Sequence, residues 1–373
     1  MREFLTYKSG KFCFCHEFNS LELAPSLLRA TILNETICDL PILPELASSI
    51  EPEIMYSSIS ATAAIEGNPI PEEDVKLIAE GEDVDGYSKK DKQEILNLIE
   101  AYDLLSRIKP SSASFQLTED LICTLHKLVT HDIPHEHNKP GEYRDGLVRV
   151  GDKAHGGVYT PPKIIEDIRN LMEIFIEWIN CDDVVDLNPF VRAALAHYYF
   201  CIIHPFWDGN GRTARLLETV ILETSNVKYV PRELSNYYYK HVDEYYIAFS
   251  QSIKLKRDPT PFLAFSLTGA ISGLTGIKSS IIRFIRILAL KDFYSNLRKK
   301  KKLTSRQYGL LSILLDSPTV FTLKDLNTKP LFSALYLRVS TQTARRDLKK
   351  LTEARYLAAN DEGECSLNMH VLG

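Results

Sequence analysis

Residues 204–215 concentrate more potential chemistry than any other stretch of the chain, and they read His-Pro-Phe-Trp-Asp-Gly-Asn-Gly-Arg-Thr-Ala-Arg. Gly209 and Gly211 can adopt positive φ, so backbone N–H groups of this turn can converge on an anion. The helix expected after the turn adds its positive N-terminal end. Arg212 and Arg215 are three residues apart, so they share one helical face and can donate to phosphate oxygens. The turn is therefore predicted to bind an anion such as a polyphosphate.

Two further side chains of this stretch could act on a bound phosphate. His204 has a reference pKa of roughly 6.5, so it can take a proton from an attacking hydroxyl near neutral pH. Asp208 precedes the turn, where a carboxylate could hold a Mg²⁺ ion that bridges the phosphates. A base, a metal carboxylate and an anion-binding turn together indicate phosphoryl or nucleotidyl transfer.

The same stretch resembles, without a gap, the Fic family pattern His-x-Phe-x-Asp/Glu-Gly-Asn-Gly-Arg-x-x-Arg. An ordinary glycine turn between core helices would explain neither the paired arginines nor the His and Asp. The resemblance implies a protein adenylyltransferase that moves AMP from ATP to a Ser, Thr or Tyr hydroxyl. ATP is then the substrate, Mg²⁺ the cofactor at Asp208, His204 the general base, and Phe206 a core anchor of the loop. The implied nucleotide-binding residues are Gly209, Asn210, Gly211, Arg212, Thr213, Ala214 and Arg215.

A second motif lies earlier in the chain, where residues 62–67 read Thr-Ala-Ala-Ile-Glu-Gly. We expect a helix over about residues 52–67, beginning at Pro52 and capped by Gly67. Glu66 then places a negative charge at a helix end that favours cations, and an isolated Glu there would simply be solvated. The segment resembles the Ser/Thr-x-x-x-Glu-Gly/Asn motif of Fic inhibitory helices. That resemblance implies that Glu66 pairs with Arg215 and keeps it from the γ-phosphate.

Between the two motifs, residues 147–150 and 158–159 have the composition of a β-hairpin, with Gly151 and Asp152 as a turn signal. In Fic proteins a hairpin at this point, the flap, covers the active site and aligns the target segment by main-chain pairing. Arg144 matches a Gly-x-x-Arg element common there, and we favour a structural role over a catalytic one.

Aromatic residues follow the catalytic stretch, and such clusters usually belong to a core. The Fic resemblance implies instead that Tyr245 and Tyr246 border the adenosine. The family often has Asn seven residues beyond this pair, where the present chain has Ile253. His197, in the apolar run before the motif, is expected to pack or hydrogen-bond in the core. The helix after the turn is expected to bury its apolar residues and leave Arg212 and Arg215 on its open side.

The predicted fold class is mainly α: a Fic helical fold with a small β-hairpin flap, plus a C-terminal winged helix-turn-helix domain of the α+β class. Residues 1–110 form an N-terminal helical region with the inhibitory helix, 111–275 the Fic core, 276–302 a basic connecting helix, and 303–373 the winged helix. Residues 110–114 are a turn-rich linker, and three glycines between 269 and 276 are expected to loosen the chain.

The winged-helix prediction depends on helices near residues 304–315, 322–327 and 340–351, followed by a hairpin. Polar side chains on the third helix could reach phosphates or base edges, namely Thr341, Thr343, Arg345, Arg346 and Lys349. Many winged helices bind proteins instead, so the partner is either DNA or another protein. A DNA-binding regulator with a Fic sensor core is therefore an alternative function.

Composition is that of an ordinary globular chain of 373 residues with a net charge of −5. We predict no secretory signal, because the N-terminus has no basic region followed by an apolar one. No uncharged apolar run reaches about 18 residues, which argues against a membrane span. An odd count of seven cysteines is typical of reduced thiols and a cytoplasmic location.

Two clusters invite a metal reading. The first cluster comprises Cys13, Cys15 and His16. Its alternating pattern is typical of a short strand, and no second pair of ligands follows at the spacing of a zinc site. The other cluster comprises His126, His131, His135 and His137, which we interpret as solvated or capping side chains.

If the protein is an enzyme, several alternatives for its reaction stay open. The reaction could be removal of AMP by hydrolysis, with Glu66 orienting water, or transfer from another nucleotide such as CDP-choline or UTP. The target is a protein with a modifiable hydroxyl, which could include this chain itself. Dimerisation is common in the Fic family, so a homodimer is a further expectation.

Overall fold

The computed structural model describes residues 2–42, 44–108, 115–255 and 258–372, so the predicted linker at 110–114 lies outside the described residues. It is mainly helical, as predicted. The chain divides into two compact units, residues 1–278 and 279–373. The predicted N-terminal region and Fic core both fall in the first unit, and the division lies within the predicted basic helix.

The first unit contains β1 (Arg2–Leu5), β2 (Lys11–Phe14), α1 (Ser20–Asp39), α2 (Pro44–Ile65), α3 (Glu72–Ala79), α4 (Lys89–Arg107), α5 (Glu119–Val129), α6 (Ile165–Ile179), α7 (Asp182–Val185), α8 (Pro189–Ile203), α9 (Asn210–Thr224), α10 (Val230–Lys240) and α11 (Val242–Lys254). The division between the units falls within α12 (Thr260–Lys299). The second unit continues with α13 (Ser305–Asp316), α14 (Asp325–Thr328), α15 (Pro330–Tyr336), α16 (Thr341–Glu353), β3 (Leu357–Ala359) and β4 (Cys365–Leu367).

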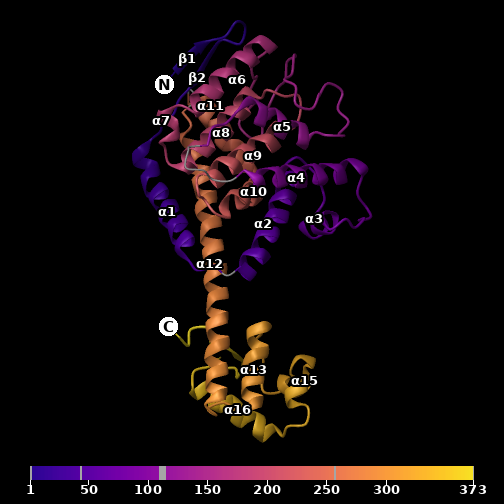
Figure 1. Cartoon of the computed structure of the whole chain (residues 1–373), viewed down its shortest axis with the longest axis vertical. Helices are drawn as coiled ribbons and strands as arrows, with labels where there is room; N and C mark the ends of the chain where they lie inside the picture. The colour runs from indigo at the N-terminus through magenta and orange to yellow at the C-terminus, as the bar shows by residue number, and fades with distance from the viewer. Residues whose placement is uncertain (1, 43, 109–114, 256–257, 373) are drawn as a thin grey trace. The chain divides into compact units, whose positions relative to one another are not determined.

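Helices α8 and α9 form the centre of the first unit (Figure 1). α8 is apolar on all faces and is almost wholly buried, because neighbours pack around it on every side. It begins at Pro189, and the Asn188 side chain caps it by accepting from the N–H of Phe190, as predicted. α9 packs on α8 and also contacts α2, α4, α5 and α10. The turn between α8 and α9 therefore has a rigid base.

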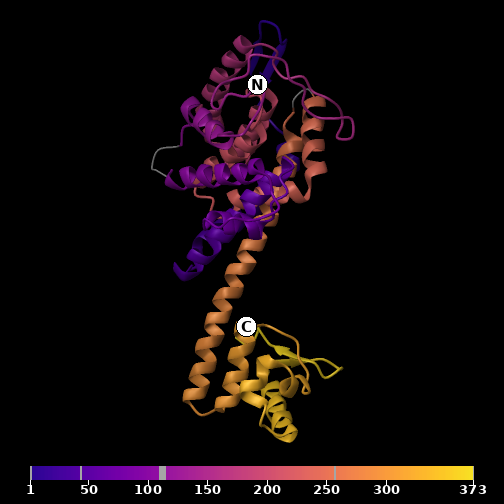
Figure 2. The same cartoon turned by 90° about the vertical axis from the view of Figure 1, so that its right-hand side faces the viewer.

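The N-terminal hairpin β1–β2 lies at the edge of the first unit (Figure 1, Figure 2). Its strands are antiparallel, with Arg2 opposite Phe14. The loop between the strands is held by the buried Asp167 of α6, whose carboxylate accepts from three consecutive backbone N–H groups. Cys13 lies within β2, whereas Cys15 and His16 follow the strand, so the strand interpretation is confirmed only for the first part of this segment.

The start of α2 differs from the prediction. The helix begins at Pro44, and Pro52, the expected first residue, lies inside it. An interior proline costs one backbone hydrogen bond, and packing of α2 against α10 offsets that loss. The predicted end is correct, because Gly67 has φ +89° and donates to the carbonyl of Ala64. Asn68 donates to the carbonyl of Ala63, which completes a Schellman cap.

The expected loosening at residues 269–276 is wrong, because α12 is helical throughout this segment. Gly269 and Gly273 approach side chains of α10 closely, so small residues are required there by packing. One window of α12 has a mean hydropathy of 1.3 and is half buried. Its length and composition would suffice to cross a membrane, but core helices of soluble proteins pass the same test.

The second unit contains the elements that the winged-helix prediction requires. α13 begins with a capping box between Thr304 and Gln307, and Ser340 caps α16. β3 and β4 form an antiparallel hairpin, shown in yellow in Figure 2. Phe321, which precedes α14, pairs with Cys365 of β4. The winged-helix assignment itself stays a prediction.

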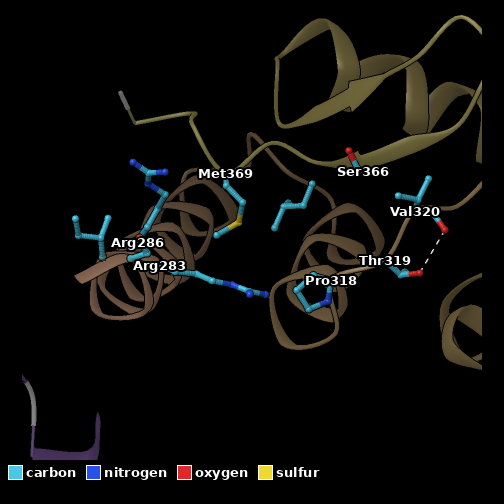
Figure 3. Close-up of a pocket in the computed structure, with 10 residues that line it drawn as sticks. Arg283, Arg286, Pro318, Thr319, Val320, Ser366 and Met369 are labelled. Carbon is cyan, nitrogen blue, oxygen red and sulfur yellow. Dashed lines mark hydrogen bonds between the residues drawn. The ribbon is translucent and has the colours of Figure 1, made fainter. Parts of the chain in front are cut away.

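A cavity of about 610 Å³ lies in the second unit between α12, residues 318–320 and residues 366–369 (Figure 3). Arg283 and Arg286 of α12 line one side, and Val320, Leu367 and Met369 line the apolar side. The guanidinium of Arg286 donates to the His370 ring at 3.3 Å.

Candidate active site

The turn between α8 and α9 is closed by its own residues. His204 ends α8 in the left-handed conformation, with φ 50° and ψ 60°. The Asn210 side chain accepts from the N–H of Phe206 at 3.0 Å and donates to the carbonyl of the same residue at 2.8 Å. Asn210 therefore clamps the turn, and the side chain of Phe206 is fully buried, as expected for a core anchor.

His126 of α5 supports the turn from beneath. Its Nδ1 accepts from the N–H of Gly141 at 2.9 Å, and its Nε2 donates to the carbonyl of Asp208 at 3.0 Å. The ring stacks on Phe206 with the ring centres 3.5 Å apart, and burial lowers its pKa to about 4. The interpretation of His126 as solvated or capping is therefore wrong. A single His on a helix has no sequence signal for a partner 82 residues away.

Gly209 is required by a close approach as well as by its backbone. It has φ +75°, and a Cβ atom there would lie 2.7 Å from the methyl carbon of Thr130. Any other residue would push α5 away from the turn.

Arg144 joins the turn to the segment that carries the predicted hairpin. Its guanidinium is fully buried and donates to the backbone carbonyls of His204, Gly146 and Pro162. Burial lowers its pKa to about 10, so it stays charged near neutral pH. These contacts are to backbone groups only, which agrees with the structural role favoured from the sequence.

Arg215 is paired with Glu66. Arg215 Nη2 donates to Glu66 Oε1 at 2.7 Å and to the carbonyl of Thr62 at 3.1 Å. Burial alone would lower the pKa of Arg215, but the Glu66 carboxylate reverses this, and the pKa lies above its ordinary value. Thr62 is itself fixed, because its hydroxyl donates to Ser235 of α10.

The expectation that both arginines lie on an open side of α9 is wrong. Arg215 and Arg212 are each 2% exposed, because helices from the N-terminal third cover α9. Arg212 donates to Asp208 Oδ2 at 2.9 Å and to the carbonyl of Val129 at 3.3 Å. Burial would raise the pKa of Asp208, but Arg212 holds it below its usual value, so the carboxylate is ionised.

A cleft of about 560 Å³ brings several predicted residues together. His204, Gly211 and Arg215 line it from the motif, and Glu66 lines it from the end of α2. Burial, with the nearby Arg144 charge, lowers the pKa of His204 to about 4. The imidazole is therefore neutral at pH 7 and free to accept a proton. Asp208, Gly209, Asn210, Arg212, Thr213 and Ala214 do not line the cleft directly.

A further wall of the cleft is formed by residues 149–152 and 155–159. They form a single bridge between Val150 and Tyr159, so the predicted strands are reduced to one antiparallel pair. His155 ties this segment to α11, with its Nδ1 2.8 Å from Asp152 and its Nε2 3.0 Å from Asp243. The Asp152 carboxylate, helped by Asp243, raises the pKa of His155. Sequence reasoning missed this tie, since the two carboxylates are far apart in the chain.

Tyr245 and Tyr246 both line the cleft but differ in burial. Tyr245 is 3% exposed, and its hydroxyl hydrogen-bonds to Nε2 of His197, which pairs in turn with Glu218. His197 is thus hydrogen-bonded in the core, as predicted. Tyr246 is 36% exposed, and both rings line the cleft together with Ile253.

Buried polar atoms at this site match an anionic guest. Arg212 Nε and Arg215 Nε have no hydrogen-bond partner among the described residues, and such atoms normally bind a ligand or water. No group of three potential metal ligands occurs in the described part of the chain. Mg²⁺ commonly takes one or two carboxylates and completes its shell with phosphate and water oxygens. The single ionised carboxylate of Asp208 therefore fits a metal that arrives with its phosphates.

Comparisons with known proteins find similarity to one family. Residues 116–222 match the Fic/DOC family, so the chain carries a Fic domain. It is 34% identical over 171 residues to Protein adenylyltransferase Fic of Nematostella vectensis, covering 46% of this chain and 38% of that protein. It is 34% identical over 193 residues to the protein of that name from Drosophila erecta, covering 50% of this chain and 36% of that protein. The chain thus spans well under half of these relatives.

Solved structures show the same fold. A Fic family protein from Desulfovibrio desulfuricans G20 aligns with a TM-score of 0.55 at 20% identity, covering 92% of this chain and 96% of that one. A fragment of Fic-1 from C. elegans aligns with a TM-score of 0.58 at 23% identity, covering 70% of this chain and 73% of that one. The predicted Fic helical fold is confirmed.

Proposed function

We propose that the protein is an adenylyltransferase that moves AMP from ATP to a hydroxyl of a target protein. One observation carries the proposal: a single cleft is lined by the neutral imidazole of His204, by Gly211 and by Arg215, three residues of the Fic motif. The relatives that match this chain over the same domain are named protein adenylyltransferases.

In the proposed reaction the target hydroxyl oxygen attacks the α-phosphorus of ATP. The bond from that phosphorus to the bridging oxygen breaks, and pyrophosphate leaves. His204 accepts the hydroxyl proton, a role typically worth 10²–10⁴-fold in rate. The Asp208 carboxylate would hold Mg²⁺, which would supply positive charge to the phosphate oxygens. The N–H groups at the start of α9, with Arg215 once it is released, stabilise the charge that develops on the leaving pyrophosphate.

We further propose that the structure represents an autoinhibited state. Arg215 cannot donate to a γ-phosphate through Nη2 while Glu66 and the Thr62 carbonyl accept from that nitrogen. A hydrogen bond between charged groups typically contributes about 1.5–3 kcal/mol, so its removal should raise transfer about 10–100-fold.

Intact-mass measurement of wild type and Glu66→Gly with ATP and Mg²⁺ tests both proposals. We expect an increase equal to one AMP group on the variant or on an added protein substrate. The same increase should be absent from Glu66→Gly combined with His204→Ala. Equal labelling of wild type and Glu66→Gly would contradict autoinhibition, and no labelling of either protein or substrate would contradict the transferase.

Two variations of the reaction share this cleft. Glu66 lines it beside His204, so a water oriented by Glu66 could hydrolyse AMP from a modified protein. Ile253 stands at the position where the family often has Asn, so another nucleotide could replace ATP. Incubation with AMP-modified protein, and a panel of labelled nucleotides, separates both from adenylylation.

For the second unit we propose contact with duplex DNA through α16. Its exposed face carries Arg345, Arg346 and Lys349, while Asp347 is turned inward and accepts from Arg306 at 2.6 Å. Phosphate contacts of this kind make affinity fall steeply with salt. Binding of a labelled duplex between 50 and 200 mM salt, compared with an Arg345→Ala/Arg346→Ala variant, tests the contact. Salt-insensitive or unchanged binding would instead favour a protein partner.

A further inference from the structure

Glu94 of α4 is a buried carboxylate that lies between the Fic motif and the turn after α2. It is 7% exposed. Its Oε2 accepts from Asn68 Nδ2 at 2.9 Å, and its Oε1 lies 3.6 Å from Arg212 Nη1. A buried carboxylate is costly unless it is paired. The half-exposed Lys90 adds a second cation 3.8 Å from Oε1. Glu94 is thus held by Asn68 at one oxygen and by Arg212 and Lys90 at the other.

Asn68 is fixed as firmly as Glu94. It is 5% exposed, and its Nδ2 also donates to the carbonyl of Asp91 at 3.0 Å. Its Oδ1 accepts from the N–H of Ile70 at 3.0 Å. All the hydrogen-bonding atoms of this side chain are thus used within the first unit, and none faces solvent as in an ordinary loop.

The position of Asn68 matters because it follows Glu66 by only two residues. Gly67, between them, has φ +89° and belongs to the Schellman cap that ends α2. The Glu66 side chain is itself 32% exposed, so water competes for its carboxylate. A fixed backbone on the far side of Gly67 limits the conformations of Glu66 and favours its contact with Arg215.

We propose that Asn68 and Glu94 form a second anchor of the inhibitory segment, which links it to Arg212 while Glu66 holds Arg215. Each motif arginine is then faced by a carboxylate from an N-terminal helix. Asn68 and Glu94 are positioning residues, because they act through Glu66 and Arg212 rather than on a nucleotide. The inference rests on the autoinhibition proposed above.

Two consequences follow. Asn68→Ala removes the anchor but leaves Glu66 in place, so it should release inhibition only in part. Because Asn68→Ala removes the hydrogen bonds of the amide, we expect transfer to rise about fivefold to thirtyfold, which corresponds to about 1–2 kcal/mol. In a Glu66→Gly background the anchor has nothing left to position, so Asn68→Ala should change transfer less than twofold.

The experiment measures initial rates of AMP incorporation for wild type, Asn68→Ala, Glu66→Gly and the double variant. Asn97→Ala is the matched control, since Asn97 is also buried and its amide donates to the carbonyl of His131. Asn97→Ala should leave inhibition intact. Equal activation by Asn97→Ala, or additive activation in the double variant, would overturn the anchor. Glu94→Gln keeps an oxygen for Asn68 but removes the charge that faces Arg212, and we expect about threefold activation.

Hydrogen exchange separates failure of the anchor from failure of the proposed function. If Glu66→Gly transfers no AMP, the adenylyltransferase proposal fails, but backbone exchange in residues 64–70 still reports on the anchor. Faster exchange there in Asn68→Ala than in Asn97→Ala supports the inference. Unchanged exchange in both Asn68→Ala and Glu94→Gln overturns it.

Discussion

The α8–α9 junction and the segment of residues 149–159 line the same cleft but are held in different ways. At the junction, side chains of α5 and α9 and the buried Arg144 hold the backbone through several hydrogen bonds. Residues 149–159 are joined to each other by the β-bridge of Val150 and Tyr159 and by hydrogen bonds to Asp152, and His155 connects them to α11. Val158 is more than half exposed. The junction is therefore preorganised for chemistry, whereas the hairpin can move with few interactions lost.

His204 at the junction and His155 in residues 149–159 also differ in the direction of their pKa shifts. Burial lowers the pKa of His204 to about 4, so the junction histidine is neutral. Two carboxylates raise the pKa of His155, so the hairpin histidine favours the charged form. The neutral ring of His204 is suited to accept a proton, and the ring of His155 is suited to form an ion pair with its two carboxylates.

The largest expected effect is at the junction. His204→Ala in a Glu66→Gly background should lower the rate of AMP transfer by about 10²–10⁴-fold, because the attacking hydroxyl loses its base. Nucleotide affinity, measured by calorimetry, should change less than threefold. A large loss of affinity with little loss of rate would show that His204 binds rather than catalyses.

Replacement of Arg144 should damage both walls together. Arg144→Met leaves buried carbonyl oxygens of the junction and of the hairpin flanks without donors, and we expect the free energy of unfolding to fall by about 3–5 kcal/mol. Urea denaturation monitored by circular dichroism measures this change. Arg149→Met, at an exposed position on the hairpin, is the control and should change it by less than about 0.5 kcal/mol. An unchanged free energy of unfolding in Arg144→Met would contradict the inference that Arg144 stabilises both walls of the cleft.

Substitutions of Tyr245 and Tyr246 should have smaller and unequal effects on the free energy of unfolding. Tyr245→Phe leaves His197 Nε2 without its partner, so we expect a loss of about 1–2 kcal/mol in unfolding free energy. Tyr246→Phe should cost less than about 0.5 kcal/mol, because that residue is 36% exposed. Thermal denaturation of the two variants gives the comparison, and equal losses would contradict it.

The smallest effect should appear at the hairpin and should depend on pH. The His155 ion pairs with Asp152 and Asp243 exist when the ring is protonated, so they are present below its raised pKa and lost as pH rises through it. After correction for intrinsic exchange, protection of residues 149–159 should be higher at pH 6 than at pH 8.5. His155→Gln should remove this dependence. NMR titration should give a midpoint above 6.5 for His155 and near 4 for His204.

Sequence reasoning succeeded for features whose residues are neighbours in the chain. The cap at Gly67, the start of α8 at Asn188 and Pro189, and the turn from His204 to Arg215 each depend on contiguous residues. It failed at the start of α2, where a proline that usually begins a helix lies inside one. Tertiary packing there outweighs the local preference.

The sequence by itself determined the residues of the motif at 204–215 and of the motif at 62–67, because their types and short spacings follow directly from the chain. The tertiary structure decided how those residues are used. It buried both arginines, placed Glu66 against Arg215 from 149 residues away, and brought Glu94 to Arg212. The Glu66–Arg215 pair was predicted from the resemblance of residues 62–67 to a known motif, and the structure confirms it. The contact between Glu94 and Arg212 joins single residues of distant segments and has no such motif. Only burial in the folded chain makes each of those charges require a partner.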